Sequence, residues 1–377
     1  MTKICYVVTV PLTIRSFFIP QLNYLASNGF DVSVICTPDE KIETELGKGI
    51  TYIPMVIPRG ISLLGSLKAI KELKHIFAKE HFDIVQYSTP NAALYASIAA
   101  KQAGCKVRNY HLMGLRYLGA SRLGRVILKT LEKITCHYST SIECVSKSNM
   151  EMGIKEGLFP PEKVTVVWNG SSGGVDLSKF DYSKRDQWRK EVRAELGYTD
   201  NDFVYGFVGR VTRDKGINEL LQAFFSLDDD SKLLLTGSME GENTLDASLL
   251  EKAREHPNIQ FHGAVTDVER YFAAIDILIL PSYREGFGNV VIEAGAVGTP
   301  AIVSGIPGPT DAIDRNKTAL VVPAKDAKAL SESMRKIRTM DVAKMGKDAA
   351  DYSAGHFDSE ELNKKIAERK RMLLEIS

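Results

Sequence analysis

Residues 275–294 read IDILILPSYREGFGNVVIEA, and the order of residue types predicts a strand, a turn and a helix. The short apolar run before Pro281 is typical of a strand buried in a parallel sheet. The glycines around Phe287 predict the turn, and an amphipathic pattern begins at Asn289. Such a turn directs backbone N–H groups and the positive end of a helix dipole at the strand end, where α/β sheets bind anions.

Two carboxylates in this stretch, Glu285 in the turn and Glu293 in the helix, would bracket a ligand that carries a phosphate and several hydroxyls. A sugar nucleotide has both. Glu293 could accept two hydrogen bonds from the vicinal hydroxyls of a ribose, and Glu285 could reach hydroxyls of a transferred sugar. The backbone from Phe287 through Gly288 and Asn289 to Val290 is a predicted anion nest. The alternative is that both carboxylates merely favour the start of a helix.

A second candidate binding loop follows the predicted strand 203–208, and this one carries cations. It contains Gly209, Arg210 and, five residues later, Lys215. Gly209 would allow close backbone approach, and the two cations would stabilise a diphosphate leaving group. They could also be loop charges without a ligand.

Apolar runs alternate with amphipathic stretches along most of the chain, which predicts parallel sheets covered by helices on both faces. The alternation breaks at the Gly/Ser-rich residues 168–174, and we predict an interdomain linker there, with the charged stretch 184–195 behind it. We therefore predict an α/β fold of two doubly wound, Rossmann-like domains, residues 1–170 and 171–357, facing each other across a cleft.

Composition is that of an ordinary globular protein, with 44% hydrophobic and 25% charged residues among 377. No apolar run reaches the roughly 18 residues of a membrane span, and no signal-peptide cleavage site follows the N-terminal apolar stretch. The five cysteines are scattered without Cys-x-x-Cys spacing, so we expect free thiols and a cytoplasmic location. The histidine spacing argues against a zinc site, and Asp228-Asp229-Asp230 is expected to end a helix in a solvated turn.

Charge is distributed unevenly. Residues 1–168 carry 20 basic and 13 acidic side chains, a net charge of +7, whereas the remainder carries 28 and 34, a net charge of −6. Within 101–135 there are eight basic residues and one acidic residue. This region could bind an anionic membrane surface or a pyrophosphate, or be a solvated helix face. No nucleic-acid recognition motif accompanies it, so nucleic acid is not an expected partner.

These motifs resemble those of family 4 retaining glycosyltransferases of the GT-B fold, over essentially the whole chain. The similarity is greatest to bacterial enzymes that build capsular polysaccharide, O-antigen or lipid-linked glycans. It is carried by the following segments: Glu285-x7-Glu293 within 281–289, Gly209-Arg210 with Lys215-Gly216, Asn169-Gly170, and Ser304–Ile313.

The resemblance implies that Arg210 and Lys215 bind the donor diphosphate, that Glu293 binds the ribose, and that Glu285 with the 287–290 backbone holds the donor sugar. It implies retention of anomeric configuration without a metal or another cofactor. The expected donor is a UDP-sugar, with an N-acetylhexosamine favoured. The expected acceptor is a lipid-pyrophosphate-linked sugar. The protein is expected to associate peripherally with the inner face of the membrane. A C-terminal helix over 358–377 is expected to pack back on the N-terminal domain.

The N-terminal half departs from the family pattern. Relatives often place a histidine before a Gly-Leu-Arg at a strand end, but here Met113 precedes Gly114. His111, two residues earlier, could supply the imidazole as a second catalytic residue beside Glu285, or it could be an ordinary strand histidine. The loop 9–16 lacks the Gly-x-Gly of many relatives and is still expected to line the acceptor side.

Two other functions fit parts of the pattern. A UDP-sugar 2-epimerase could use the same fold, although no acid/base pair for the sugar's C2 stands out. A non-catalytic sugar-nucleotide-binding scaffold subunit is the second alternative, and the presence of Arg210, Lys215, Glu285 and Glu293 argues against it.

Overall fold

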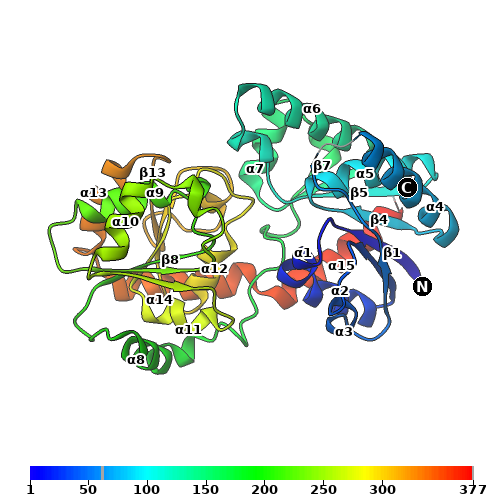
Figure 1. Ribbon diagram of the computed structural model, residues 1–377. Helices are drawn as coiled ribbons and strands as arrows, with labels where there is room; N and C mark the ends of the chain where they lie inside the picture. The colour runs from blue at the N-terminus through cyan, green and yellow to red at the C-terminus, as the bar shows by residue number, and fades with distance from the viewer. Residues whose placement is uncertain (61–62, 376–377) are drawn as a thin grey trace. The chain divides into compact units, whose positions relative to one another are not determined.

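The structure, a computed structural model, describes residues 1–60 and 63–375 of the chain. The chain forms two compact units (Figure 1). Unit 1 comprises Met1–Gly173 with Ser359–Ser377, and unit 2 comprises Gly174–Asp358. We had expected the boundary after residue 170 and the last helix from residue 358; the observed boundaries lie at Gly173 and Ser359.

Unit 1 contains a parallel sheet in which the described residues form seven strands, in the order β3-β2-β1-β4-β5-β6-β7. These strands are β1 (Thr2–Val7), β2 (Phe30–Cys36), β3 (Ile50–Pro54), β4 (Ile84–Tyr87), β5 (Val107–Leu112), β6 (Ser141–Cys144) and β7 (Val164–Thr165). Its helices are α1 (Pro11–Phe17), α2 (Ile19–Ser27), α3 (Ile42–Glu45), α4 (Leu63–Glu80), α5 (Pro90–Gln102), α6 (Arg122–Tyr138), α7 (Lys147–Lys155) and α15 (Ser359–Glu375).

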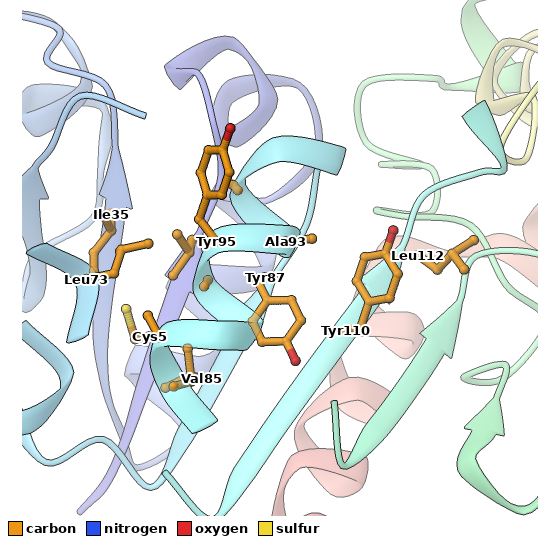
Figure 2. Close-up of a cluster of buried hydrophobic side chains, with 14 of the residues drawn as sticks. Cys5, Ile35, Leu73, Val85, Tyr87, Ala93, Tyr95, Tyr110 and Leu112 are labelled. Carbon is orange, nitrogen blue, oxygen red and sulfur yellow. The ribbon is translucent and has the colours of Figure 1, made fainter. Parts of the chain in front are cut away.

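Side chains alternate along each strand and so point to both faces of this sheet, and helices bury both faces. Cys5 and Val7 of β1 join a core with α4, α5 and α6, whereas Ile4 and Tyr6 join a core with α1, α2 and α15. Figure 2 shows the first core, in which Tyr87 stacks on Tyr110 with ring centroids 6.0 Å apart. The C-terminal helix α15 thus forms part of the second core of unit 1.

Unit 2 repeats the arrangement with six described strands in the order β10-β9-β8-β11-β12-β13, all parallel. They are β8 (Val204–Val208), β9 (Lys232–Thr236), β10 (Ile259–Gly263), β11 (Ile277–Leu280), β12 (Ala301–Ser304) and β13 (Ala319–Val322). The helices are α8 (Arg185–Leu196), α9 (Ile217–Phe225), α10 (Ala247–Glu255), α11 (Val268–Ala274), α12 (Asn289–Ala296), α13 (Ala327–Ile337) and α14 (Val342–Phe357). The predicted α/β class, with two doubly wound sheets, is confirmed.

The charged stretch 184–195 is not part of a linker, contrary to our prediction. It forms α8, which packs against α11 within unit 2. Arg193 is buried, and its guanidinium donates to Asp276 Oδ2 at 2.8 Å, while Arg189 donates to Asp276 Oδ1 at 2.6 Å. The charge of this helix is therefore compensated inside the unit, which its sequence alone does not reveal.

Within the described residues 1–60 and 63–375, none of the helices combines the length and the apolar character needed to cross a bilayer.

Candidate active site

The candidate site of unit 2 lies where the strand order reverses, between β8 and β11. In the first half of this sheet the chain moves outward from β8 to β9 and β10, and in the second half it moves outward from β11 to β12 and β13. The chain therefore continues in opposite directions after β8 and after β11. The loops that follow these two strands lie at the carboxyl edge of the sheet, where open α/β sheets bind ligands. Both predicted motifs, Gly209–Gly216 and Pro281–Gly288, are these loops.

Glycines let the loops approach each other backbone to backbone. Gly216 has φ +75°, and a Cβ added there would lie 2.1 Å from the carbonyl oxygen of Pro281. Gly209 has φ +148°, and a Cβ on Gly237, after β9, would lie 1.8 Å from the Gly209 carbonyl oxygen. No other residue fits at Gly216 or Gly237 without displacing a neighbouring loop.

Lys215 and Glu285 meet across these loops. The Lys215 ammonium lies 2.6 Å from Glu285 Oε1, and the Ser282 hydroxyl donates to the same oxygen at 2.8 Å. The side chains are 20% and 14% exposed, so the pair is partly shielded but open to a ligand. The structure thus joins two residues that we had predicted for separate parts of a ligand.

Asp214 holds the surrounding loop in shape. Its carboxylate accepts from Thr212 at 2.6 Å and from Arg284 at 3.0 Å, and its carbonyl accepts from the Tyr283 N–H at 2.9 Å. Arg210, the other predicted cation, lies 3.9 Å from Asp214 and is 53% exposed. Its guanidinium is therefore loosely held beside a carboxylate that fixes the loops of both strands.

The predicted anion nest is the N-terminus of α12. Phe287 is buried with its ring 5.3 Å from that of Phe357, and Gly288 caps the helix with φ +95°. Asn289 and Val290 form the first turn. Because a glycine cap offers no side chain, the helix dipole is positioned to act on a bound anion.

Glu293 lies one turn into α12 from Asn289, and its side chain is partly buried. Burial raises the pKa of its carboxyl to about 7, and the charge of Lys179 opposes this shift. Within residues 1–60 and 63–375, no hydrogen-bond donor reaches this carboxylate. A ligand with hydroxyl groups could supply the missing hydrogen bonds.

His111, the predicted catalytic residue of unit 1, lies inside the sheet and is 8% exposed. Its Nδ1 is 3.3 Å from the Ser88 hydroxyl, and its ring packs edge-on against Phe18. Burial lowers the pKa of His111 to about 4, with Glu143 opposing and Lys370 reinforcing the shift. The imidazole is therefore neutral near pH 7, and its catalytic role stays a prediction.

A buried ion pair lies beside His111 and connects α15 to β6. Lys370 is fully buried, and its ammonium lies 2.5 Å from Glu143 Oε2. His111, Glu143 and Lys370 line the same narrow cavity, with Gln21 and Gln86. Coulombic attraction between the partners stabilises the charged carboxylate, which lowers the pKa of Glu143 despite its burial.

Sequence reasoning missed three participants. Ser282 lies inside the motif we had quoted, and its position three residues before Glu285 could have indicated it. Asp214 lies between Arg213 and Lys215, and the sequence pattern indicated only the cations of this loop. Lys179, which acts on the pKa of Glu293, carries no signal in the sequence, since over a hundred residues separate the two.

Comparison with known proteins gives matches along both units. The family model described as "Glycosyl transferases group 1" matches residues 189–354, and "Glycosyl transferase 4-like" matches residues 3–146. The capsular polysaccharide biosynthesis glycosyltransferase CapM of Staphylococcus aureus is 32% identical over 338 residues, which cover 89% of this chain and 87% of CapM. An Escherichia coli UDP-Gal:alpha-D-GlcNAc-diphosphoundecaprenol alpha-1,3-galactosyltransferase is 28% identical, covering 81% of this chain and 80% of that protein.

Solved structures share the fold. Sucrose-phosphate synthase from Thermosynechococcus elongatus aligns with a TM-score of 0.82 at 20% identity, covering 100% of both chains. Anabaena HepE in complex with UDP-glucose aligns with a TM-score of 0.79 at 18% identity, covering 99% of this chain and 100% of that chain. These likenesses confirm the predicted GT-B fold class.

The close approach at Gly216 can be tested against a second glycine of unit 2. Gly197 has nearly the same backbone, with φ +73°, but a Cβ there would meet nothing within 4 Å. Gly197→Ala should cost about 1 kcal/mol of left-handed strain and lower the melting temperature by roughly 2–4 °C. Gly216→Ala adds the clash with Pro281, so we expect at least about twice that decrease. Equal melting temperatures for the two variants would contradict the packing described here.

Proposed function

This chain belongs to the group 1 glycosyl transferases and is a hexosyltransferase, and from this premise we propose that it transfers a sugar from a UDP-sugar to a lipid-diphosphate-linked acceptor. The observation that carries the proposal is the Lys215–Glu285 pair at the strand-order reversal of unit 2, next to the N-terminus of α12. This arrangement combines a cation, a helix dipole and a carboxylate within one ligand's reach.

In this proposal, Lys215 and Arg210 bind the donor diphosphate. A diphosphate carries more negative charge than the Glu285 carboxylate, so it can replace Glu285 as the partner of the Lys215 ammonium. Glu285 then accepts from hydroxyls of the donor sugar, and the backbone of Phe287–Val290 faces the phosphate oxygens. Charge that develops on the leaving diphosphate is stabilised by groups already in position, since the loops are fixed by Asp214.

Glu293 binds the ribose in the same proposal. Its carboxylate has no donor among the described residues and is partly desolvated, so two vicinal hydroxyls would remove an energetic penalty when they bind. We favour uridine as the base and an N-acetylhexosamine as the sugar. The Escherichia coli relative is named for UDP-Gal, and a Campylobacter jejuni relative at 26% identity is named as an N-acetylgalactosaminyltransferase.

The acceptor is proposed to be a sugar on a lipid diphosphate, in the synthesis of a bacterial surface polysaccharide. The Escherichia coli and Campylobacter jejuni relatives are named for diphosphoundecaprenol or diphospho-undecaprenol acceptors, and CapM is named for capsular polysaccharide biosynthesis. We further propose retention of configuration without a metal. The bond from the sugar C1 to the diphosphate breaks, the acceptor oxygen attacks C1 from the same face, and the acceptor proton passes to the leaving phosphate.

We propose that unit 1 binds the membrane surface through α6. Leu123 and Val126 on this helix are 74% and 63% exposed, and Ile127 is exposed as well. Arg122 and Lys133 are exposed cations on the same helix. Arg125 and Lys129 pair with Glu156 at 2.8 and 2.7 Å, so part of the basic charge is compensated. Exposed apolar and basic residues on one helix favour binding in the interface of an anionic bilayer.

The transfer activity is tested by incubating the full-length protein with a panel of UDP-sugars and an undecaprenyl-diphosphate-linked N-acetylglucosamine. We expect nucleotide release, a lipid-linked disaccharide with the donor's anomeric configuration, and no loss of rate in EDTA. An inverted product or inhibition by EDTA would disprove the mechanism. Epimerised UDP-sugar formed without acceptor would favour a 2-epimerase, and a lack of nucleotide release with every donor would favour a scaffold subunit.

The donor site is tested by binding of the active UDP-sugar, measured by calorimetry. Lys215→Ala removes a charged hydrogen bond and should weaken binding about 10- to 100-fold. Only about a tenth of the Glu293 carboxyls are ionised at pH 6 when the pKa is about 7, so wild-type affinity should rise by up to about tenfold from pH 6 to 8. Glu293→Gln should bind weakly at both values without this rise.

Glu285→Ala should mainly lower kcat, because Glu285 contacts the transferred sugar in our proposal. Lys344→Ala, which removes an exposed lysine of α14, is the control and should bind as wild type does. Unchanged affinity in both Lys215→Ala and Glu293→Gln would refute the site assignment.

The membrane face is tested with phosphatidylglycerol liposomes. Val126→Asp introduces a charge into the apolar part of α6 and should reduce binding several-fold, whereas Leu12→Asp, at an exposed leucine of α1, should not. Binding of wild type should weaken as salt rises to about 0.5 M, because screening shortens the reach of the cations. Binding that ignores both salt and Val126→Asp would exclude this face.

A further inference from the structure

Helices α4, α5 and α6 are neighbours in unit 1 (Figure 1), and residues of all three line a groove of about 570 Å³. Its size falls within the roughly 300–1,000 Å³ of small-molecule sites. All of its lining residues belong to unit 1, and they differ from the residues that line the cavity containing His111.

The floor of the groove is apolar. Leu94 and Ile98 contribute from α5, and Leu128 and Leu131 contribute from α6. All four side chains are only partly buried, so the protein leaves hydrocarbon surface accessible inside a concavity. Burying such surface against another apolar group is favourable, and a chain of hydrocarbon would do so.

The mouth of the groove is polar and lies at the carboxyl edge of the sheet. Asn91 follows β4 closely and Arg116 follows β5 closely, so both stand where parallel strands end. The Asn91 amide donates to the carbonyls of Pro58 and Gly60, both at 2.9 Å, and closes one side. From Asn91 to Ile98 the groove follows α5 for seven residues, a depth of roughly 10 Å.

One acidic side chain, Glu132, reaches the groove. It accepts a hydrogen bond from the Tyr110 hydroxyl at 2.6 Å, and burial raises the pKa of its carboxyl to about 7. A substantial share of these carboxyls is therefore neutral near pH 7, which limits the charge that a hydrocarbon ligand meets.

Polarity thus changes along the groove, from an exposed guanidinium at the mouth to hydrocarbon on the floor. Arg116 is exposed, and Leu67 of α4, which also lines the groove, is exposed as well, so the apolar lining reaches the protein surface. The ligand that matches this order has an anionic head group and one hydrocarbon chain. A fully apolar ligand would leave Arg116 without a partner, and a free phosphate would leave the floor empty.

We propose that the α4–α5–α6 groove binds the first isoprene units of the acceptor's lipid chain, with Arg116 at its mouth next to the lipid phosphate. This inference rests on the proposed function for the identity of the lipid. It assigns unit 1 a subsite for the chain itself, in addition to the contacts made by exposed residues of α6 with the bilayer surface. The acceptor's diphosphate and sugar would then lie at the carboxyl edge of the unit 1 sheet.

The test uses full-length protein and geranylgeranyl monophosphate, a single isoprenoid chain with a phosphate and no sugar, below the concentration at which it forms micelles. Leu131→Trp and Ile98→Trp fill the floor and should weaken binding by about tenfold or more, measured by calorimetry. Thr130→Trp places the same side chain one residue earlier on α6, at an exposed site outside the groove, and should bind within about twofold of wild type.

The head-group contribution is measured with geranylgeraniol, which lacks the phosphate, and with inorganic phosphate as competitor. Arg116→Ala should weaken the phosphate ligand more than the alcohol. Circular dichroism and melting temperature establish that the tryptophan variants are folded.

Equal binding by wild type and folded Leu131→Trp would overturn the proposal, as would equal loss in Thr130→Trp. Absence of saturable binding to wild type would also overturn it, and would be the result if the groove's occupant were a partner protein. Full displacement by inorganic phosphate alone would show a basic surface rather than a chain site.

Failure of the proposed function is distinguishable, because it would abolish transfer to every lipid-linked acceptor in wild type. Failure of the groove alone would leave transfer intact and the acceptor KM unchanged in Leu131→Trp.

Discussion

The ion pair between Lys215 and Glu285 depends on a constraint of topology. The residues are 70 positions apart, and they meet at 2.6 Å because β8 and β11 are adjacent parallel strands whose following loops leave the same edge of the sheet. A partly buried ion pair contributes little net stability, since desolvation offsets much of the attraction. In the proposed function, the pair holds a cation in position until the donor diphosphate replaces the carboxylate. The glycines at 209, 216 and 237 serve the same end, because they let neighbouring loops touch through their backbones and so fix the pair.

The local sequence of unit 2 predicted the strand, turn and helix around Glu285 well. The apolar run 275–281 and the Gly-Phe-Gly turn indicate strand, turn and helix through backbone preferences that act over a few residues, and the observed β11 and α12 agree with them. The segment 184–195 was misjudged because its arginines appear solvated in the sequence, whereas Asp276, over eighty residues away, pairs with two of them. The raised pKa of Glu293 likewise depends on burial, which the spacing of residues does not contain. The sequence could not predict ion pairs between distant segments, nor the burial of a side chain by such segments.

Unit 1 has different residues at the corresponding edge of its sheet. The strand order reverses between β1 and β4, and there the hydroxyls of Thr9 and Thr89 lie 2.8 Å apart, while Thr89 itself adopts φ +64°. Behind this edge the buried Lys370–Glu143 pair connects α15 to β6, with neutral His111 beside it. Removing either charged partner would leave the other buried without compensation, at a cost of about 3–5 kcal/mol. The C-terminal helix is therefore a structural part of unit 1, although the whole of unit 2 separates it in the chain.

In our proposals, helix α6 contacts the core, a lipid and water at once. Its 17 residues present Thr135 and Cys136 to the core, Leu128 and Leu131 to the groove, and Leu123 with Val126 to the exterior. A helix with a single buried face would need only one apolar stripe, so the exposed Leu123 and Val126 raise the cost of contact with water without adding to the core. That cost is recovered when hydrocarbon covers them. In unit 2 the corresponding deficit is the Glu293 carboxylate, which is partly desolvated and lacks a donor among the described residues. Each unit therefore keeps an unmet interaction, apolar in one and polar in the other, and these two features support the proposed reaction between a lipid-linked acceptor and a nucleotide sugar.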